Sequence, residues 1–223
     1  VKKGLDYFWY VSVIDAHGKE NQSEIFAFHV NAPPNKPTLT SPAPNGVAIS
    51  ITQVWLNATF TDPEGDVMDA SWYWSNGTLI GTKTGIANGT TTGIQVTVSR
   101  GNDYSWYVSV TDGYETNQSD IFTFHVNAIP NAPILNSPAD RESINNLWVV
   151  LNATYTDPEG DSGYLRFYDN TSGTPVLLNE TAVTNGQMVT FNWTGLVRGN
   201  IYTWYAEAED TFGEIRKADQ RSF

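Results

Sequence analysis

The sequence Asp-Tyr-Ser-Trp-Tyr-Val-Ser-Val at residues 103–110 decides the fold. Apolar or aromatic residues recur at every second position, as they do in a half-buried β-strand. This alternation predicts that one face of the strand carries the inward side chains, which are Tyr104, Trp106, Val108 and Val110. The same alternation is present in residues 54–60 and 121–126, no helical period persists, and turn residues interrupt the chain every ~8–12 residues. The sequence therefore predicts an all-β protein.

The strand at 103–110 is one copy of a repeat. Residues 6–13 match it closely and residues 201–208 match it more loosely. The segment 56–66, which ends in Asp-Pro-Glu-Gly-Asp, returns at 151–161 with a single change, from Phe60 to Tyr155. The chain is therefore expected to be a tandem array of units of about 96 residues, a common size for one domain.

Short proline-rich segments at 32–37 and 128–133 mark the joints between units. They divide the chain into residues 1–32, 33–128 and 129–223, named below the hairpin, the middle module and the last module. The hairpin is expected to be the final two strands of a truncated module. The last strand of the last module is expected to be incomplete, with Phe223 aligned to Phe122. We expect a segment of a longer array, and strand exchange between subunits is the alternative if the native chain begins here.

Each unit has room for about seven short strands, which is typical of a two-sheet sandwich. An apolar residue, a glycine three positions later and a tyrosine six positions later occur at Val98, Gly101 and Tyr104, with matching triplets in 1–7 and 196–202. This spacing is typical of a tyrosine corner. With the Asp-Pro-Glu-Gly-Asp turns and Ser41-Pro42, the whole chain resembles fibronectin type III (Ig-like) modules, in particular the tandem modules of prokaryotic, especially archaeal, cell-surface and surface-layer glycoproteins. The resemblance implies tandem β-sandwich modules and says little about activity.

The amino-acid composition excludes several classes of partner and site. The chain has 24 Asp+Glu against 12 Lys+Arg, a net charge of −12, and this argues against nucleic acid or an anionic membrane as partner. It has no cysteine, which excludes disulfides, zinc–thiolate sites, iron–sulfur clusters and thiol nucleophiles. No run of about 18 apolar residues is present, so no membrane span is expected in this segment.

The Asp-Pro-Glu-Gly-Asp turns are candidate metal sites. In a sandwich of this kind they lie at the same pole as the loops that begin at Asp112 and Asp210, next to the preceding module. Clustered carboxylates suit Ca²⁺, which accepts irregular coordination by hard oxygen ligands. The first predicted calcium site is Asp62, Glu64, Asp66 and Asp112, and the second is Asp157, Glu159, Asp161 and Asp210. The alternative is a solvated turn in which each Asp accepts local backbone hydrogen bonds.

Catalysis is not expected. The acidic residues recur in both full modules, whereas a catalytic pair would be expected once. His29 and His125 occupy matching strand positions, and His17 stands alone, so no metal-ligand or triad spacing exists. The sequence predicts a non-enzymatic protein with structural histidines.

Asparagine sequons are about twice as frequent as chance predicts. They occur at Asn21, Asn57, Asn76, Asn88, Asn117, Asn152, Asn170, Asn179 and Asn192. Their loop or outward strand positions favour N-glycosylation, and the alternative is an ordinary Asn- and Thr-rich β-protein surface.

The aromatic residues divide by strand phase. Trp9, Trp106 and Trp204 are expected in the cores. An outward stripe is a possible interaction face, able to stack on sugars or on a neighbouring module, and consists of Tyr10, Tyr73, Tyr107 and Tyr205. The alternative is cross-strand pairing on the outer face of the protein's own sheet.

These patterns favour a structural extracellular protein, a segment of a surface layer, sheath or filament whose partners are neighbouring modules or further copies. The alternative is a carbohydrate-binding or adhesion module, or a spacer in a secreted enzyme. Glycans are candidate partners in either case.

Overall fold

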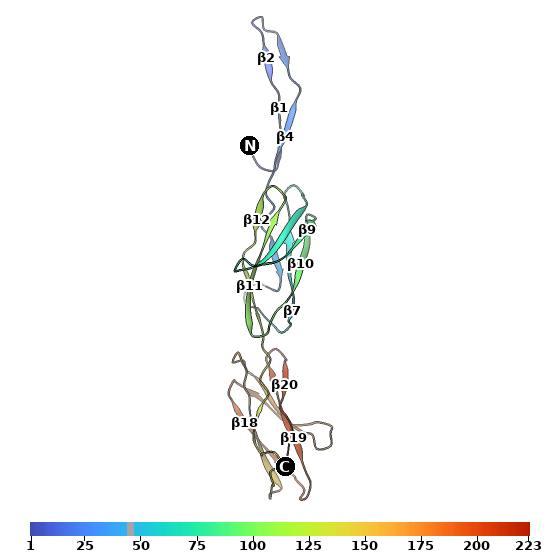
Figure 1. Cartoon of the computed structure of the whole chain (residues 1–223), viewed down its shortest axis with the longest axis vertical. Coiled ribbons are helices and arrows are strands. Elements are labelled where there is room, and N and C mark those ends of the chain that lie inside the picture. The colour runs from blue at the N-terminus through green and yellow to red at the C-terminus, as the bar shows by residue number, and fades with distance from the viewer. Residues whose placement is uncertain (44–46) are drawn as a thin grey trace. The chain divides into compact units, whose positions relative to one another are not determined.

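A computed structural model describes residues 1–43 and 47–223, and within them every regular element is a β-strand (Figure 1). The all-β prediction is confirmed. Within the same residues no helix is long and apolar enough to cross a membrane. The chain forms two compact units, residues 1–47, 53–98 and 103–124 in the first and residues 48–52, 99–102 and 125–223 in the second. The joint after the hairpin therefore lies inside the first unit, and the joint before the last module lies inside the second.

The hairpin is a two-stranded ribbon. β1 (Leu5–Trp9) pairs with β4 (Phe26–Val30), and β2 (Ser12–Ile14) pairs with β3 (Glu20–Gln22). Trp9 stacks on Phe26 but is 49% exposed, so its predicted core position is wrong. The physical reason is that no second sheet covers this face among the described residues of the first unit.

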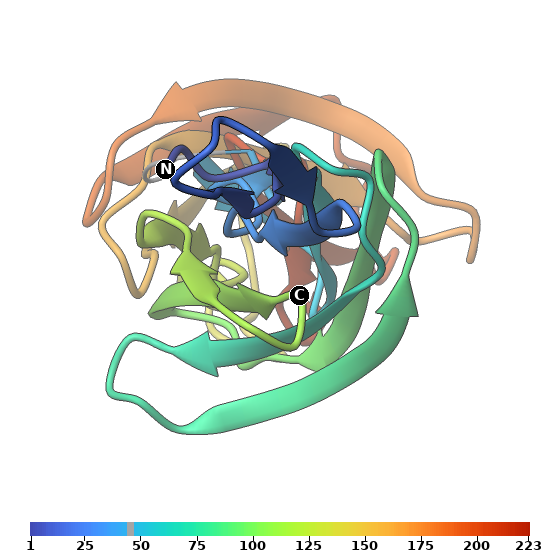
Figure 2. The ribbon, with the colours of Figure 1, turned by 90° about the horizontal axis from the view of Figure 1, so that it is seen from above.

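The middle module contains two sheets. The first has the order β10-β7-β5 and the second the order β6-β13-β11-β8-β9, with β12 added beside β11. Their bounds are β5 (Thr38–Ser41), β6 (Val47–Ile49), β7 (Gln53–Phe60), β8 (Met68–Trp74), β9 (Leu79–Ile86), β10 (Thr90–Thr97), β11 (Asn102–Thr111), β12 (Thr116–Gln118) and β13 (Phe122–Val126). The hairpin of β8 and β9 runs from turquoise to green in Figure 2.

The predicted alternation is what builds this core. On β7 the four inward residues are buried, and they are Val54, Leu56, Ala58 and Phe60. Trp72 and Trp106 are fully buried, and the indole N–H of Trp72 donates to the carbonyl of Leu56 at 2.9 Å. Each buried aromatic side chain removes a large apolar area from water, which is the main stabilising term in a module without disulfides.

The last module repeats this plan with sheets β14-β15-β18 and β17-β16-β19-β20, and β21 pairs with β19. Its core includes Leu151, Tyr155, Phe167 and Trp204. The tyrosine corner is present, because the Tyr202 hydroxyl accepts the backbone N–H of Val197 at 2.9 Å. The bounds are β14 (Ile134–Ser137), β15 (Trp148–Thr154), β16 (Gly163–Asp169), β17 (Val176–Val183), β18 (Met188–Thr194), β19 (Thr203–Asp210), β20 (Ile215–Lys217) and β21 (Arg221–Ser222).

The end of the last module is in a different register from the predicted one. Phe223 stacks on Tyr202 at 5.7 Å between ring centroids, just as Phe124 stacks on Tyr104 at 5.4 Å. Phe223 therefore corresponds to Phe124, and the predicted match to Phe122 is wrong. The shift arises in the loop that begins at Asp210, which has one more residue than the loop that begins at Asp112. The backbone N–H of Asp112 donates to the carbonyl three residues later, at Glu115, whereas that of Asp210 donates to the carbonyl four residues later, at Glu214.

The outward tyrosines form stacked cross-strand pairs. Tyr73 and Tyr107 stack at 5.2 Å, and Tyr168 and Tyr205 stack at 5.0 Å. Tyr205 is only 7% exposed, since Lys217 also lies over its ring, so its predicted place on an open interaction face is wrong. Of the four predicted residues, Tyr10 is exposed while Tyr73 and Tyr107 are partly buried.

Candidate functional site: the acidic poles at the module joints

Each Asp-Pro-Glu-Gly-Asp segment folds into a turn around its first aspartate. Asp62 Oδ1 accepts the backbone N–H of Glu64 at 2.8 Å and that of Asp66 at 3.3 Å. Gly65 has a backbone φ of +85°, a conformation that residues other than glycine rarely adopt. Asp157 makes the equivalent contacts with Glu159 and Asp161 at 2.8 and 3.2 Å. The predicted local hydrogen bonding of these turns is therefore present in both modules.

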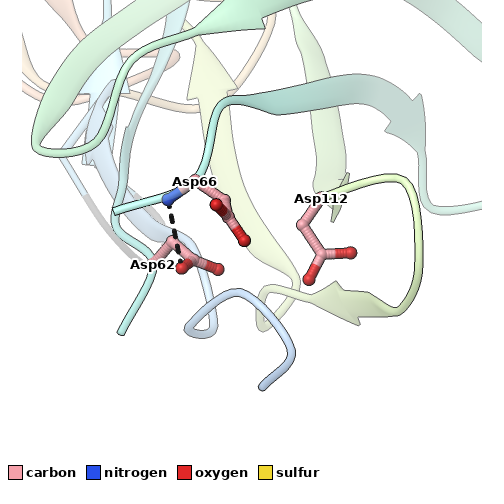
Figure 3. A group of neighbouring side chains, drawn as sticks. All are labelled: Asp62, Asp66 and Asp112. Carbon is pink, nitrogen blue, oxygen red and sulfur yellow. Dashed lines mark hydrogen bonds between the residues drawn. The ribbon is translucent and has the colours of Figure 1, made fainter. Parts of the chain in front are cut away.

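The first acidic pole joins this turn to the loop after β11. Carboxylate oxygens of Asp62, Asp66 and Asp112 all lie within 4.8 Å of one another. Figure 3 shows the three side chains facing one small space, with the Asp62–Asp66 hydrogen bond dashed. Asp62 is 4% exposed, and its Oδ2 atom has no hydrogen-bond partner among the described residues. A buried carboxylate oxygen without a partner, next to two more carboxylates, is costly unless a cation compensates it.

The second acidic pole is more enclosed. Oxygens of Asp157, Glu159 and Asp161 lie within 4.8 Å of one another. Burial raises the pKa of Asp161, and the charges of Asp157, Glu159 and Asp210 raise it further, so Asp210 is part of the same electrostatic cluster. Asp157 Oδ2 is buried and unpaired in the described part of the chain.

Two neutral oxygens at this pole also lack partners among the described residues. The hydroxyl of Tyr155 and the amide oxygen Oδ1 of Asn127 belong to side chains that are fully buried. Burial and the charges of Asp157, Asp210 and Asp161 raise the pKa of Tyr155 far above its usual value. The second pole therefore places uncompensated oxygen atoms from carboxylate, amide and phenol groups in one buried region.

The first pole is also where the hairpin attaches. Asn31 Nδ2 donates to Asp112 Oδ2 at 2.8 Å, and the N–H of Ala32 donates to Glu64 Oε2 at 2.7 Å. The other oxygen of Glu64 pairs with Nε2 of His29. Glu64 was predicted as a metal ligand, but the clustered carboxylates of the first pole are Asp62, Asp66 and Asp112, and both oxygens of Glu64 contact the hairpin.

The second pole attaches to the middle module through the same set of contacts. Asn127 Nδ2 donates to Asp210 Oδ2 at 2.8 Å, the N–H of Ala128 donates to Glu159 Oε2 at 2.7 Å, and His125 pairs with Glu159 Oε1. The joint contacts are thus an Asn–Asp, a backbone–Glu and a His–Glu pair, and all three occur at both joints.

A basic residue completes each joint. Lys3 Nζ contacts Glu115 Oε2 at 2.7 Å, and Arg100 contacts Glu214 at 2.9 Å. Lys3 and Arg100 each precede the glycine of a tyrosine corner, at matching positions of the repeat. The glutamates come from the loops that begin at Asp112 and Asp210, so each acidic pole receives a cation from the preceding module.

Two pKa shifts follow from the first joint. Hydrogen bonds to Asp6 and Glu64 raise the pKa of His29 above 6.5. Burial would raise the pKa of Asp112, but the backbone N–H of Glu115, the amide of Asn31 and the backbone N–H of Tyr114 together lower it below its ordinary value of 3.8. Of these contacts, those of His29 with Glu64 and of Asp112 with Asn31 cross the joint, and each favours the charged form.

The acidic residues of the poles were predicted from the sequence, but their contact partners at the joints were not. Asn31, Asn127, Lys3 and Arg100 were not predicted to have a role, and the histidines were expected to be structural. A signal was present, since the heptad Phe-x-Phe-His-Val-Asn-Ala ends both the hairpin and the middle module. Polar His and Asn at the end of an apolar strand, repeated at two joints, indicate contacts at those joints.

The sequon asparagines differ in whether their Nδ2 atom, the site of glycan attachment, is already used. In three of them Nδ2 already donates a hydrogen bond. Asn117 donates to the carbonyl of Pro34, Asn170 to the side chain of Gln220 and Asn179 to the side chain of Thr181. Asn57 and Asn152 are half-buried on β7 and β15. The exposed sequon asparagines are Asn21, Asn76, Asn88 and Asn192.

No known protein family matches the sequence, and no curated protein does. Among solved structures, domains A168–A170 of titin match with a TM-score of 0.53 and 15% identity, over 97% of this chain and 73% of theirs. The modules therefore have an Ig/fibronectin type III-like fold. The FN1–FN3 domains of chicken CNTN1 align less well, with a TM-score of 0.38 and 11% identity over 97% of this chain and 76% of theirs. A PKD domain of an M14-like peptidase from a Thermoplasmatales archaeon is 22% identical, with a TM-score of 0.34, over 44% of this chain and all of its own length.

Proposed function

We propose that this chain is a segment of an extracellular structural protein, a component of a surface layer, sheath or filament, in which Ig-like modules are joined by stiff connections. The observation that carries the proposal is the duplicated joint, with the same three polar contacts on both sides of the middle module. A flexible tether would not need directed contacts between an acidic pole and the strand before it.

Calcium binding at the two acidic poles is the second part of the proposal. The first site consists of Asp62, Asp66 and Asp112, and the second of Asp157, Glu159 and Asp161 with Asp210 close by. Carboxylate oxygens in irregular array are ligands that Ca²⁺ accepts, and the unpaired buried oxygens of Asp62 and Asp157 support this assignment. An ion at either pole would lock the residues that also hold the joint.

Calorimetric titration of the chelator-treated protein tests the metal sites. Saturation at about 100 times the dissociation constant stabilises the folded protein by about 2.7 kcal/mol, so the melting temperature rises on addition of Ca²⁺ and falls with EGTA. Asp157→Asn removes one site and Asp62→Asn the other, whereas Asp219→Asn, an exposed aspartate outside both poles, changes neither. A melting temperature unaffected by EGTA, with no heat on titration, would exclude calcium while leaving the joint contacts intact.

Surface location and glycosylation form the third part. Four sequon asparagines are exposed, and glycans on Asn21, Asn76 and Asn192 would meet no competing contact of Nδ2 within the described residues. Intact-mass measurement of the native protein shows any added mass. Labelling of intact source cells with a membrane-impermeant reagent, followed by electron microscopy of the labelled structure, tests the location and the regular array together. Unlabelled protein of bare polypeptide mass would contradict this part of the proposal.

The alternative of a carbohydrate-binding face has no specific support in the fold. Of its four predicted tyrosines, Tyr73, Tyr107 and Tyr205 stack on cross-strand neighbours, and only Tyr10 is exposed. A structural role therefore agrees better with how these side chains are used.

A further inference from the structure

Asn127 has an unpaired oxygen atom at the second acidic pole, although its side chain is completely buried. Its Nδ2 atom donates to Asp210 Oδ2 at 2.8 Å. An ionised aspartate only accepts hydrogen bonds, so this contact fixes which end of the amide is the nitrogen. The other end, Oδ1, has no hydrogen-bond partner among the described residues. Burying an amide oxygen in this way costs free energy unless something binds it.

The neighbouring acid, Asp210, already uses both of its oxygens. Its Oδ1 accepts the backbone N–H groups of Phe212 at 2.8 Å and Glu214 at 2.9 Å, and its Oδ2 accepts the hydrogen bond from Asn127. Asp210 therefore holds its own loop and orients the amide. The unpaired buried oxygens at this pole, within the part of the chain that the structure describes, are those of Asn127, Tyr155 and Asp157.

Strand pairing brings these oxygens into one buried region. Gly163 of β16 pairs with Asp210 of β19. A Cβ atom added to Gly163 would lie 2.8 Å from the Tyr155 hydroxyl, so this hydroxyl packs directly against the Gly163 backbone. The charges of Asp157 and Asp210 both act on the same hydroxyl. Tyr155 and Asp157 therefore lie beside Asp210, which in turn holds the amide of Asn127.

The middle module has apolar side chains at two positions where this region is polar. Phe60 corresponds to Tyr155 and Met68 to Gly163, and both apolar side chains are fully buried. A side chain at residue 163 is excluded, because its Cβ would lie 2.0 Å from a backbone carbonyl oxygen of β19. The second pole thus has a hydroxyl and bare backbone where the middle module has a phenyl ring and a thioether. An unpaired buried hydroxyl lowers stability unless it has a ligand.

A cation satisfies this group of oxygens better than a water molecule does. Carboxylate oxygens of Asp157, Glu159 and Asp161 lie within 4.8 Å of one another, and Asp157 is 5% exposed. A buried water would supply hydrogen bonds but no positive charge. Ca²⁺ takes about six to eight oxygen ligands and accepts asparagine carbonyl oxygens together with carboxylates.

We propose that Asn127 Oδ1 is a ligand of the cation at the second pole, so that the strand before the joint supplies part of the coordination shell. This proposal rests on the proposed calcium site and adds to it a ligand from the other side of the joint. One amide then has two roles, since Nδ2 holds Asp210 and Oδ1 holds the ion. Calcium binds more tightly when the strand is in place, and by linkage it holds the strand in place to the same extent.

The test measures calcium affinity by calorimetric titration of the full chain carrying Asp62→Asn, which leaves only the second pole. Adding Asn127→Ala removes both the amide oxygen and the donor. The affinity should then fall at least about tenfold, the scale on which even groups outside the ligand shell change metal affinity. Asn127→Asp loses the donor but keeps an oxygen, so its affinity should be at least that of the parent. Asn31→Ala, at the matching position of the first joint, should leave the affinity unchanged.

The two variants of Asn127 distinguish a ligand from a residue that only holds Asp210. In the second case both substitutions would weaken binding, and Asn127→Asp would weaken it more because it places two carboxylates against each other. That order, or an unchanged affinity in Asn127→Ala, would overturn the proposal and leave the calcium site intact. Absence of heat from the parent chain would overturn the calcium site as well.

A measurement on the unaltered side chain keeps the test independent of how the variants fold. In the isotope-labelled full chain, the NMR resonance of the Asn127 side-chain carbonyl carbon should shift on saturation with Ca²⁺, because its oxygen then binds the ion. The same resonance of Asn76, an exposed asparagine in a turn of the middle module, serves as the reference and should not shift. An unshifted Asn127 resonance in protein that binds calcium would overturn the proposal.

Discussion

The two joints use the same contacts at different depths. At the second joint Asn127 is fully buried and Asp210 is 2% exposed, whereas Asn31 and Asp112 at the first joint are only partly buried. The basic pairs differ in the same direction, since Arg100 and Glu214 are 33% and 27% exposed but Lys3 and Glu115 are 54% and 38% exposed. The same polar contacts therefore specify a joint both where water is excluded from them and where water can reach them.

The largest difference between the joints is expected for the asparagines. Asn127→Ala leaves a buried carboxylate oxygen of Asp210 without its donor, so the last module should lose about 2 kcal/mol of unfolding free energy, as for hydrogen bonds to charged groups. Asn31→Ala should cost less than about 1 kcal/mol, because water can reach Asp112. Urea unfolding of the two variants measures the difference. Equal losses would show that burial does not separate the joints.

The next effect concerns the residue where the two repeats differ, Phe60 and Tyr155. The Tyr155 hydroxyl is buried without a partner among the described residues, so Tyr155→Phe should stabilise the last module by about 1 kcal/mol in EGTA. The reciprocal Phe60→Tyr should destabilise the middle module by a similar amount, since Phe60 is fully buried. Thermal unfolding of both variants checks the pair. A destabilised Tyr155→Phe would mean that its hydroxyl is hydrogen-bonded.

The basic residues should show a smaller effect. Arg100→Ala is expected to cost about 1 kcal/mol, because Arg100 is two-thirds buried and also donates to the Asn127 carbonyl. Lys3→Ala should cost about 0.3 kcal/mol, as exposed pairs do. Stability measured at low and at high salt tests the ranking, and the more exposed Lys3 pair should be the more strongly screened. A larger loss for Lys3→Ala would reverse the comparison.

The smallest effect is a pH dependence at the first joint. Hydrogen bonds to Asp6, within the hairpin, and to Glu64, across the joint, raise the pKa of His29. Through the Glu64 contact protonation favours attachment, and this contribution is lost as pH rises through the raised pKa. Hydrogen exchange at the Ala32 amide, corrected for its intrinsic pH dependence, should therefore become faster over that range. In His29→Gln the corrected rate should stay level. A slope that persists in the variant would assign the titration to another group.

Much of the fold follows from the sequence, because period-two alternation and repeat boundaries are local properties. The inward residues of β7 and the tyrosine corner are where the pattern predicts them. Trp9 is not buried, since burial depends on a second sheet that the described hairpin lacks, and strand phase cannot show this. The register of Phe223 was missed because one additional residue in the loop after Asp210 shifts everything behind it.

The candidate site also has a part that the sequence predicts and a part that only the fold reveals. The acidic residues could be predicted because three of the four in each site fall within one turn of five residues. The contact of Asn31 with Asp112, or of Asn127 with Asp210, joins residues about 80 positions apart and requires the fold to place them together. The metal sites remain a prediction, for which the unpaired oxygens of Asp62 and Asp157 provide a structural reason.

The pairing of Asn with Asp gives an assembly of such modules a polarity. At each joint the asparagine comes from the earlier module and the aspartate from the later one, so the two surfaces are different and the contact is heterologous. A heterologous contact has no two-fold axis and does not close on itself as a dimer. Modules joined in this way form an oriented series with two unlike ends, one offering an acidic pole and the other a strand.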